Sequence, residues 1–140
     1  MLELTDNERN YLAGQLLGRL ATIGPDGSPQ VRPVGFIVNE QTATIDIGGH
    51  NLGRSRKFAN IRRDNRVSLV VDDLASIEPW APRGIEIRGE AEAIGGVEPV
   101  RPGFSSELIL IHPIRVIAWG LDTGAFDAPN ARNTHPKESA

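Results

Sequence analysis

The segment from Gly84 to Ile94 constrains the fold more than any other part of the sequence, because apolar and charged residues alternate along it. The apolar set would face one side of an extended strand: Ile85, Ile87, Ala91 and Ala93. The charged set would face the other side: Glu86, Arg88, Glu90 and Glu92. A strand with one apolar and one wet face is typical of an antiparallel sheet that covers a core on one side only.

Five further segments have the composition of strands. They are residues 19–23, 30–38, 42–47, 67–71 and 108–121. The turn sequence Gly24-Pro-Asp-Gly-Ser-Pro29 separates the first two of these segments, and Asn39-Glu-Gln41 is typical of a hairpin between the second and the third. The first three strands should therefore form an antiparallel meander.

Two short helices are expected beside the strands. Thr5-Asp-Asn-Glu8 has the form of a capping box and should begin a helix whose apolar stripe includes Leu12, Leu16 and Leu17. A second helix should run from Leu52 to Arg63. Six short strands with few helices predict a mainly β fold, a small closed barrel, because closure removes exposed sheet edges. An immunoglobulin-like sandwich fits less well, since it has no place for a helix between the third and fourth strands.

Length and composition set further bounds. A chain of 140 residues predicts one domain, over residues 1–121, followed by a polar and flexible tail at 122–140. The absence of cysteine excludes disulfides and thiol chemistry, and the net charge of −3 disfavours a protein that coats nucleic acid. Neither a signal peptide nor an apolar run long enough to span a membrane is present, so we expect a cytoplasmic protein that is not bound to a membrane.

Residues 48–60, Gly-Gly-His-Asn-Leu-Gly-Arg-Ser-Arg-Lys-Phe-Ala-Asn, are the segment most suggestive of chemistry. Its glycines allow close approach of the backbone to a ligand, and a helix N-terminus expected near Asn51 to Gly53 would present unpaired amides. Arg54, Arg56 and Lys57 crowd the first turn, where cations oppose the helix dipole. A bound phosphate would reverse that penalty, so the segment predicts an anion site, with a solvated basic face as the alternative.

Two segments resemble a known family. Ser55-Arg-Lys57, followed by Arg66-Val-Ser-Leu-Val-Val-Asp72, resembles the phosphate-binding segment of the pyridoxamine 5′-phosphate oxidase-like split β-barrel family, and Leu20-Ala-Thr-Ile-Gly-Pro-Asp-Gly-Ser-Pro-Gln-Val31 resembles its opening hairpin. Other motifs are most similar to an actinobacterial group, within the branch that uses the deazaflavin coenzyme F420, some of whose members reduce tetracycline-type polyketide intermediates. These motifs are Ile47-Gly-Gly-His-Asn51, Ser55-Arg-Lys-Phe58, Val70-Val-Asp-Asp-Leu-Ala75, Arg83-Gly-Ile-Glu-Ile-Arg-Gly-Glu90, Ile111-His-Pro113 and Ala118-Trp-Gly-Leu121.

The resemblance implies a six-stranded split β-barrel of the FMN-binding type, with short flanking helices, that forms a homodimer with the cofactor at the subunit interface. It places the cofactor phosphate on Arg56 and Lys57 and the ring system against residues 30–34 and the turn at 48–51. Residues of the partner chain near Trp80 or Trp119 would close the site. The cofactor-binding residues that it implies are Gln30, Arg32, Pro33, Gly49, His50, Asn51, Arg54, Ser55, Arg56, Lys57, Asn60 and Trp80.

The function implied is that of an F420-dependent reductase, which passes hydride from the reduced deazaflavin to an unsaturated small molecule such as a polycyclic polyketide of antibiotic biosynthesis. The alternatives are an FMN-dependent oxidoreductase of the same fold and a non-catalytic carrier of F420 or FMN. Trp119 precedes Gly120-Leu-Asp122, where true oxidases of the family have an Arg-Leu-x-x-Arg-like segment. Oxidation of pyridoxamine phosphate is therefore not expected.

The sequence predicts no catalytic residue and no metal ligand of the protein's own. His50, His112 and His135 have no evident carboxylate partner in the sequence, and no nucleophile and base occur in a recognisable arrangement. This pattern suits hydride transfer, because the reactive atom belongs to the cofactor and the protein positions it.

Overall fold

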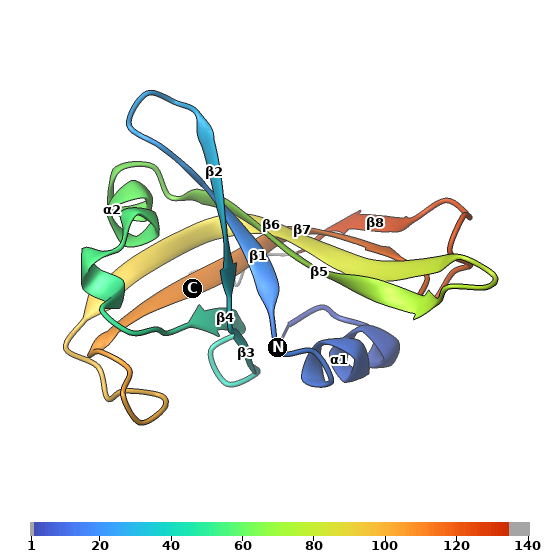
Figure 1. Ribbon diagram of the computed structural model, residues 1–140, viewed down its shortest axis with the longest axis horizontal. Helices are drawn as coiled ribbons and strands as arrows, with labels where there is room; N and C mark the ends of the chain where they lie inside the picture. The colour runs from blue at the N-terminus through green and yellow to red at the C-terminus, as the bar shows by residue number, and fades with distance from the viewer. Residues whose placement is uncertain (1, 135–140) are drawn as a thin grey trace.

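Three long antiparallel strands run along the molecule and form the middle of its sheet (Figure 1). They are β5 (Arg66–Ser76), β6 (Ala81–Gly95) and β7 (Glu107–Trp119). The computed structural model describes residues 2–134. The shorter strands are β1 (Gly18–Ile23), β2 (Pro29–Val34), β3 (Ile37–Asn39), β4 (Thr44–Ile47) and β8 (Asn130–Asn133). Their order in the sheet is β2-β1-β5-β6-β7-β4-β3, with β8 paired to β7.

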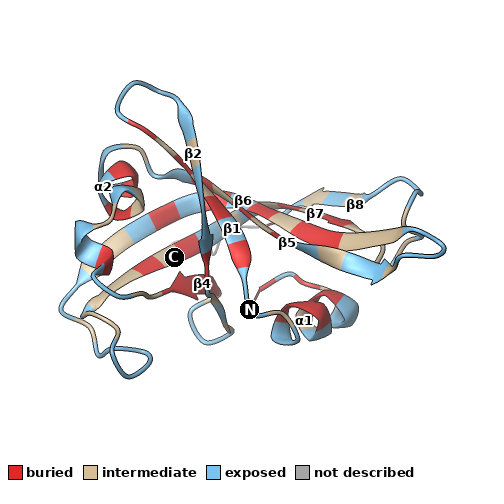
Figure 2. Ribbon diagram, in the orientation of Figure 1, coloured by how far each residue is buried: buried red, intermediate tan, exposed pale blue. Residues whose placement is uncertain are grey.

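The alternation along β6 behaves as the sequence predicts. Ile85, Ile87 and Ala91 are buried, whereas Arg88, Glu90 and Glu92 are exposed. Figure 2 shows the buried positions gathered along the middle of the sheet. The apolar core is drawn mainly from β1, β4, β5, β6 and β7, which contribute Leu20, Ile45, Ile47, Val67, Leu69, Val71, Ile85, Ile87, Ala91, Ile109, Ile111, Val116 and Ala118. The prediction of a mainly β, antiparallel fold is confirmed.

The strand count and the closed barrel differ from the prediction. Within residues 2–134 the sheet has eight strands, and its path has two free ends, β2 and β3, so strand pairing does not close it. The expected strand 30–38 is broken at Gly35 and Phe36, so β2 pairs only with β1 while β3 pairs with β4. Both predicted hairpins are present, between residues 19–23 and 30–38 and across Asn39-Glu-Gln41, but the break in the middle segment means that the three segments do not form one continuous meander.

Both predicted helices form, with altered ends. The capping box is confirmed at α1 (Asp6–Ala13), where Thr5 Oγ1 accepts from the Glu8 amide at 3.1 Å and Glu8 Oε1 accepts from the Thr5 amide at 2.9 Å. The helix ends before Leu16 and Leu17, so both are exposed instead of extending its apolar stripe. The second helix is divided into a 3₁₀ turn, η1 (Leu52–Arg54), and α2 (Arg56–Arg63). Within the described chain, no helix has the length and apolar character needed to cross a membrane.

The segment expected to be a flexible tail contributes β8 and returns to the N-terminal helix. Arg132 donates from both terminal nitrogens to the carboxylate of Glu8, whose side chain is completely buried. Asp122 accepts from the Thr5 hydroxyl at 2.6 Å and from the Asn7 side chain at 2.8 Å. These contacts hold residues 122–134 against α1, and residues 135–140 lie outside the described part of the chain.

Candidate functional site

A groove lies between the β1–β2 hairpin and the start of α2 and has a volume of about 680 Å³. Six of the twelve sequence-predicted residues line it: Gln30, Arg32, Pro33, Ser55, Arg56 and Lys57. Val31 also lines the groove and lies within the segment 30–34 that the resemblance placed against the ring, whereas Leu20, Thr22 and Pro29 were not predicted. Their presence follows from the hairpin register, which places Leu20 opposite Arg32 and Thr22 opposite Gln30.

The turn between β1 and β2 fixes one wall of the groove. Asp26 Oδ1 accepts hydrogen bonds from the Ser28 amide at 3.0 Å and from the Ser28 hydroxyl at 2.6 Å. Gly27 takes a positive φ of 84°, which glycine adopts without steric penalty. The Gly24 amide then donates to the Ser28 carbonyl at 2.8 Å and closes the turn. The Gly-Pro-Asp-Gly-Ser-Pro sequence therefore sets which side chains of β2 reach the groove.

Ser55 begins the helix that forms the opposite wall. Its hydroxyl accepts from the Phe58 amide at 3.3 Å and donates to the Leu52 carbonyl at 2.6 Å. The first turn of α2 holds no acidic residue, and Arg56 and Lys57 occupy its first two positions. Amides at these positions have no acceptor within a helix and point out of its N-terminus. An anion in the groove would meet these amides together with both cationic side chains.

The positively charged side chains around the groove repel one another when no anion is bound. Burial lowers the pKa of the Lys57 ammonium below its usual value, and the positive charge of Arg32 lowers it further. Arg32 comes from β2 and Lys57 from α2, so cations face the groove from two sides. A bound anion would relieve this repulsion, which makes the groove a better anion site than a solvated basic face would be.

Asn60 lies behind the groove and joins its two walls. Its side chain is buried, and Nδ2 donates to Thr22 Oγ1 at 3.0 Å and to Gln30 Oε1 at 2.9 Å. Arg63 in turn donates to Asn60 Oδ1 at 3.2 Å and to the Ile23 carbonyl at 3.0 Å. Asn60 positions the hairpin against α2 and is not among the residues that line the groove.

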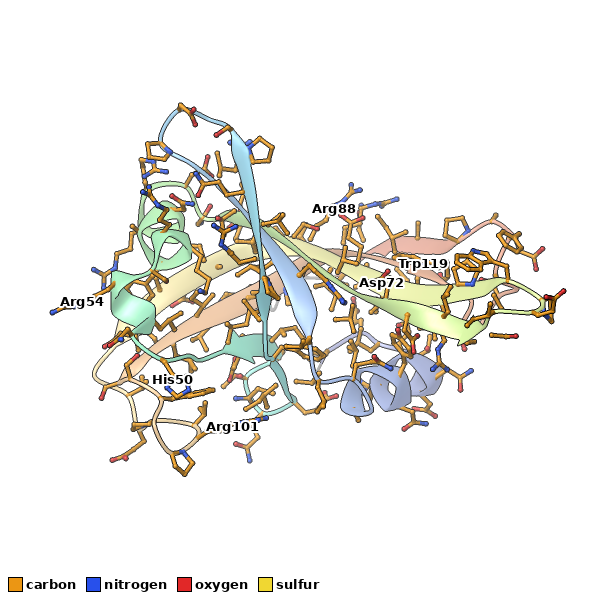
Figure 3. The ribbon with its side chains drawn as sticks, in the orientation of Figure 1. His50, Arg54, Asp72, Arg88, Arg101 and Trp119 are labelled. Carbon is orange, nitrogen blue, oxygen red and sulfur yellow. The ribbon has the colours of Figure 1, made fainter. Side chains whose placement is uncertain are left out.

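The turn at residues 48–53 lies outside the groove lining. His50 Nδ1 is 2.7 Å from the Gly103 carbonyl oxygen, and its ring meets that of Phe104 edge to face. Asn51 adopts a left-handed φ of 51° before η1, and Gly49 accepts from the Ser105 amide at 3.0 Å. Figure 3 shows His50 beside the loop that carries Arg101, while Arg54 extends away from the molecule. These residues therefore anchor the 95–106 loop.

The expectation of unpaired amides near Asn51 to Gly53 is wrong. The Leu52 amide donates to Ser105 Oγ at 2.9 Å, and the Gly53 amide donates to Glu107 Oε1 at 2.8 Å. The α-helix starts later, at Arg56, because Ser55 is extended and caps it. The amides available to an anion are consequently those at the start of α2.

Trp80 and Trp119 belong to the other end of the molecule from α2. Trp80 lies in the turn between β5 and β6 and is 57% exposed. Figure 1 places that turn at the opposite end of the long strands from α2. Trp119 is the last residue of β7 and pairs with Gly84 of β6. Figure 3 shows its labelled side chain on the opposite side of the molecule from Arg54. Neither tryptophan lines the groove of its own chain.

One histidine has a carboxylate partner that sequence spacing did not reveal. His112 Nε2 is 2.6 Å from Glu92 Oε1 across β6 and β7, and both side chains are exposed. Both residues lie within strands, Glu92 in β6 and His112 in β7. His135 falls outside the described residues. Among residues 2–134, no group of three or more His, Cys, Asp or Glu side chains is arranged to hold a metal ion.

Comparisons with known proteins identify relatives of the chain. A family model described as pyridoxamine 5′-phosphate oxidase matches residues 4–109. Over 134 residues the chain is 41% identical to the 5a,11a-dehydrotetracycline/5a,11a-dehydrooxytetracycline reductase of Streptomyces rimosus, and the match covers 94% of each protein.

Solved structures share the fold. The conserved hypothetical protein Rv2991 from Mycobacterium tuberculosis superposes with a TM-score of 0.65 at 23% identity, covering 85% of this chain and 86% of that one. A heme binding protein from Mycobacterium smegmatis gives a TM-score of 0.69 at 16% identity, covering 95% of this chain and 60% of that one. At such identities the likeness concerns the fold alone.

Proposed function

The chain belongs to the pyridoxamine 5′-phosphate oxidase family, in the group that includes the dehydrotetracycline reductase of Streptomyces rimosus, and from this membership we propose that it is an F420-dependent reductase. The substrate proposed is an unsaturated polycyclic polyketide of the tetracycline type, because the Streptomyces relative is named for such substrates and is similar over nearly its whole length. Hydride would pass from the reduced deazaflavin to a carbon–carbon double bond of the substrate, with a proton completing the reduction.

The observation that carries the proposal is the cationic groove. Arg32, Arg56 and Lys57 surround one space of about 680 Å³, and the first amides of α2 face the same end. F420 contains a phosphodiester and a polyglutamate tail, so it needs cations over a longer distance than the single phosphate of FMN. Arg54 stands exposed just before α2 and would extend the cationic surface toward such a tail.

The chain's own residues would bind and orient the cofactor. Arg56 and Lys57 would hold the phosphate, and Leu20, Pro29 and Val31 supply apolar surface against which a ring system can pack and exclude water. The cofactor, when bound, supplies the hydride. This division of roles suits a groove that combines cationic side chains with apolar surface.

We further propose that the protein is a homodimer in which a partner subunit covers the groove. The β5–β6 hairpin exposes three large apolar side chains, Leu74, Ile77 and Trp80, which contact with a second subunit would bury. Sedimentation equilibrium should give twice the monomer mass of 15.2 kDa, and a stable monomer would contradict the dimer.

Titration with each cofactor tests the assignment of F420. Equilibrium binding followed by absorption and fluorescence should give tight binding of F420 and weaker binding of FMN. Tight FMN binding without F420 binding would support the flavin-dependent alternative. Reduced F420 mixed with a dehydrotetracycline and with simpler enones should be oxidised in the presence of the protein. F420 binding without oxidation by any acceptor would support the carrier alternative.

F420 binding is expected to weaken as the pH rises through the pKa of Lys57. In the free protein, burial and Arg32 hold this pKa below the usual lysine value of 10.5. A bound anion favours the ammonium and raises the pKa, so binding takes up a proton at pH values between the two. The affinity is therefore fully present below the free-protein pKa and declines above it.

Fluorescence titrations from neutral pH up to the usual lysine value measure this dependence. Lys57→Arg keeps the positive charge but does not titrate in this range, so its affinity should stay nearly constant. The same decline in both proteins would show that Lys57 is not the group responsible.

A further inference from the structure

The outer edge of β2 has an unusual pattern of backbone groups. The Gly24 amide donates to the Ser28 carbonyl, which identifies these two residues as a hydrogen-bonded pair at the start of the β1–β2 ladder. Hydrogen-bonded pairs recur at every second residue in an antiparallel ladder. Gln30 and Arg32 therefore bond to β1, and Pro29, Val31 and Pro33 turn their backbone groups outward.

Proline has no amide hydrogen, so Val31 carries the one outward N–H between Pro29 and Pro33. β2 is an end strand of the sheet, and no neighbouring strand covers this edge within the described residues. The Val31 carbonyl already accepts from Arg32 Nη1 at 3.1 Å. Val31 is 55% exposed and lines the groove. The edge therefore presents a single backbone donor to whatever fills the groove.

Polar side chains in the same stretch already have partners within the protein. Thr22 Oγ1 and Gln30 Oε1 both accept from Asn60, and the Ser55 hydroxyl caps α2. Arg56 and Lys57 lie at the helix end of the groove, where they suit the phosphate. For a flat heteroaromatic ring beside β2, the Val31 amide is thus the one backbone donor on this edge, in addition to the side-chain donors of Gln30 and Thr22, whose oxygens accept from Asn60.

We propose that the Val31 N–H donates a hydrogen bond to a ring nitrogen or carbonyl oxygen of the bound cofactor and so fixes the ring along the edge of β2. This inference rests on the proposed function, because it takes the deazaflavin as the occupant of the groove. Val31 would then bind the cofactor through its backbone. A backbone donor cannot be recognised from the type of the side chain, so the sequence alone does not indicate this role.

Val31→Pro removes the donor and Val31→Ala keeps it. Proline is tolerated at outward positions of an edge strand, and the same edge already holds Pro29 and Pro33. We expect Val31→Pro to raise the Kd for F420 about tenfold and to reduce the change in the absorption spectrum of F420 on binding. Val31→Ala keeps the donor and loses only part of the apolar contact with the ring, so it should bind F420 more tightly than Val31→Pro does. Equal Kd values and spectra for the two variants would overturn the inference.

A measurement on the wild-type protein tests the same inference even if the proline variant does not fold. The amide hydrogen of Val31 should exchange rapidly in the free protein and become protected when F420 binds, as followed by nuclear magnetic resonance. Unchanged exchange in a protein that binds F420 would overturn the role of Val31 while leaving the proposed function intact. Failure of the wild-type protein to bind F420 would instead contradict the proposed function itself.

Discussion

Alanine at Arg56 or at Lys57 is expected to weaken F420 binding by about 10- to 100-fold, which corresponds to the loss of one hydrogen bond to a charged group. Both side chains line the groove at the start of α2, and neither is required by the core. The variants should therefore fold as the wild type does. Isothermal titration calorimetry with F420 measures the change in affinity.

A matched control separates a specific contact from the loss of one positive charge. Arg88 is exposed on β6, where it forms an ion pair with Glu86 at 2.8 Å (Figure 3). Arg88→Ala changes the net charge by the same amount as Arg56→Ala and should leave the Kd for F420 nearly unchanged. Equal losses of affinity in all three variants would mean that the phosphate site has been misplaced.

The same substitutions should not destabilise the free protein. Because the pKa of Lys57 is lower in the folded chain than its usual value, the ammonium opposes folding wherever it remains protonated. This unfavourable contribution is present below the folded pKa and disappears as the pH rises above it. Lys57→Ala removes the charge, so urea unfolding at neutral pH should give a free energy equal to or above that of the wild type.

Arg132→Ala is expected to lower the free energy of unfolding by about 3 kcal/mol, because it leaves the buried carboxylate of Glu8 without its cationic partner. Glu8 is fully buried, and besides Arg132 the Thr5 amide donates to it within the capping box. Water cannot readily replace the guanidinium at that position. Urea unfolding followed by circular dichroism measures the loss.

Two companion variants test the cause. Arg115 also reaches β8, where it donates to Asn133 at 2.8 Å, but both side chains are exposed. Arg115→Ala should change the free energy of unfolding by no more than about 0.5 kcal/mol. Adding Glu8→Gln to Arg132→Ala removes the unpaired charge and keeps an acceptor for Thr5, so the double variant should recover part of the lost stability. A double variant less stable than Arg132→Ala would contradict this explanation.

Local features of the fold could be predicted from the sequence, whereas strand partners could not. The alternation in β6, the turn at Gly24 to Pro29 and the capping box at Thr5 each depend on residues close together in the chain. Patterning defines which face of a strand is buried but not which strand lies beside it. The pairing of β4 and β8 with β7, and the break after Val34, consequently differ from the predicted meander and tail.

For the groove, too, residues that form a local motif could be predicted from the sequence, whereas residues brought in by tertiary structure could not. Ser55 to Lys57 form a local motif, and the structure brings this motif against Gln30 to Pro33. Thr22 and Leu20 reach the groove through the hairpin register, which no spacing rule supplies. The amides of Leu52 and Gly53 donate to the side chains of Ser105 and Glu107, which lie more than fifty residues later in the chain. Such partners are decided by tertiary packing and leave no trace in the local sequence.

The prolines of β2 also bear on how the protein behaves at high concentration. An unpaired strand edge invites a strand from another molecule to extend the sheet, which is a common route to aggregation. At Pro29 and Pro33 an incoming strand finds no amide hydrogen, so it cannot build a continuous ladder along the edge. A small ligand needs only one donor, whereas an added strand needs several at regular intervals. The edge can therefore stay open to a cofactor while it resists pairing with a second sheet.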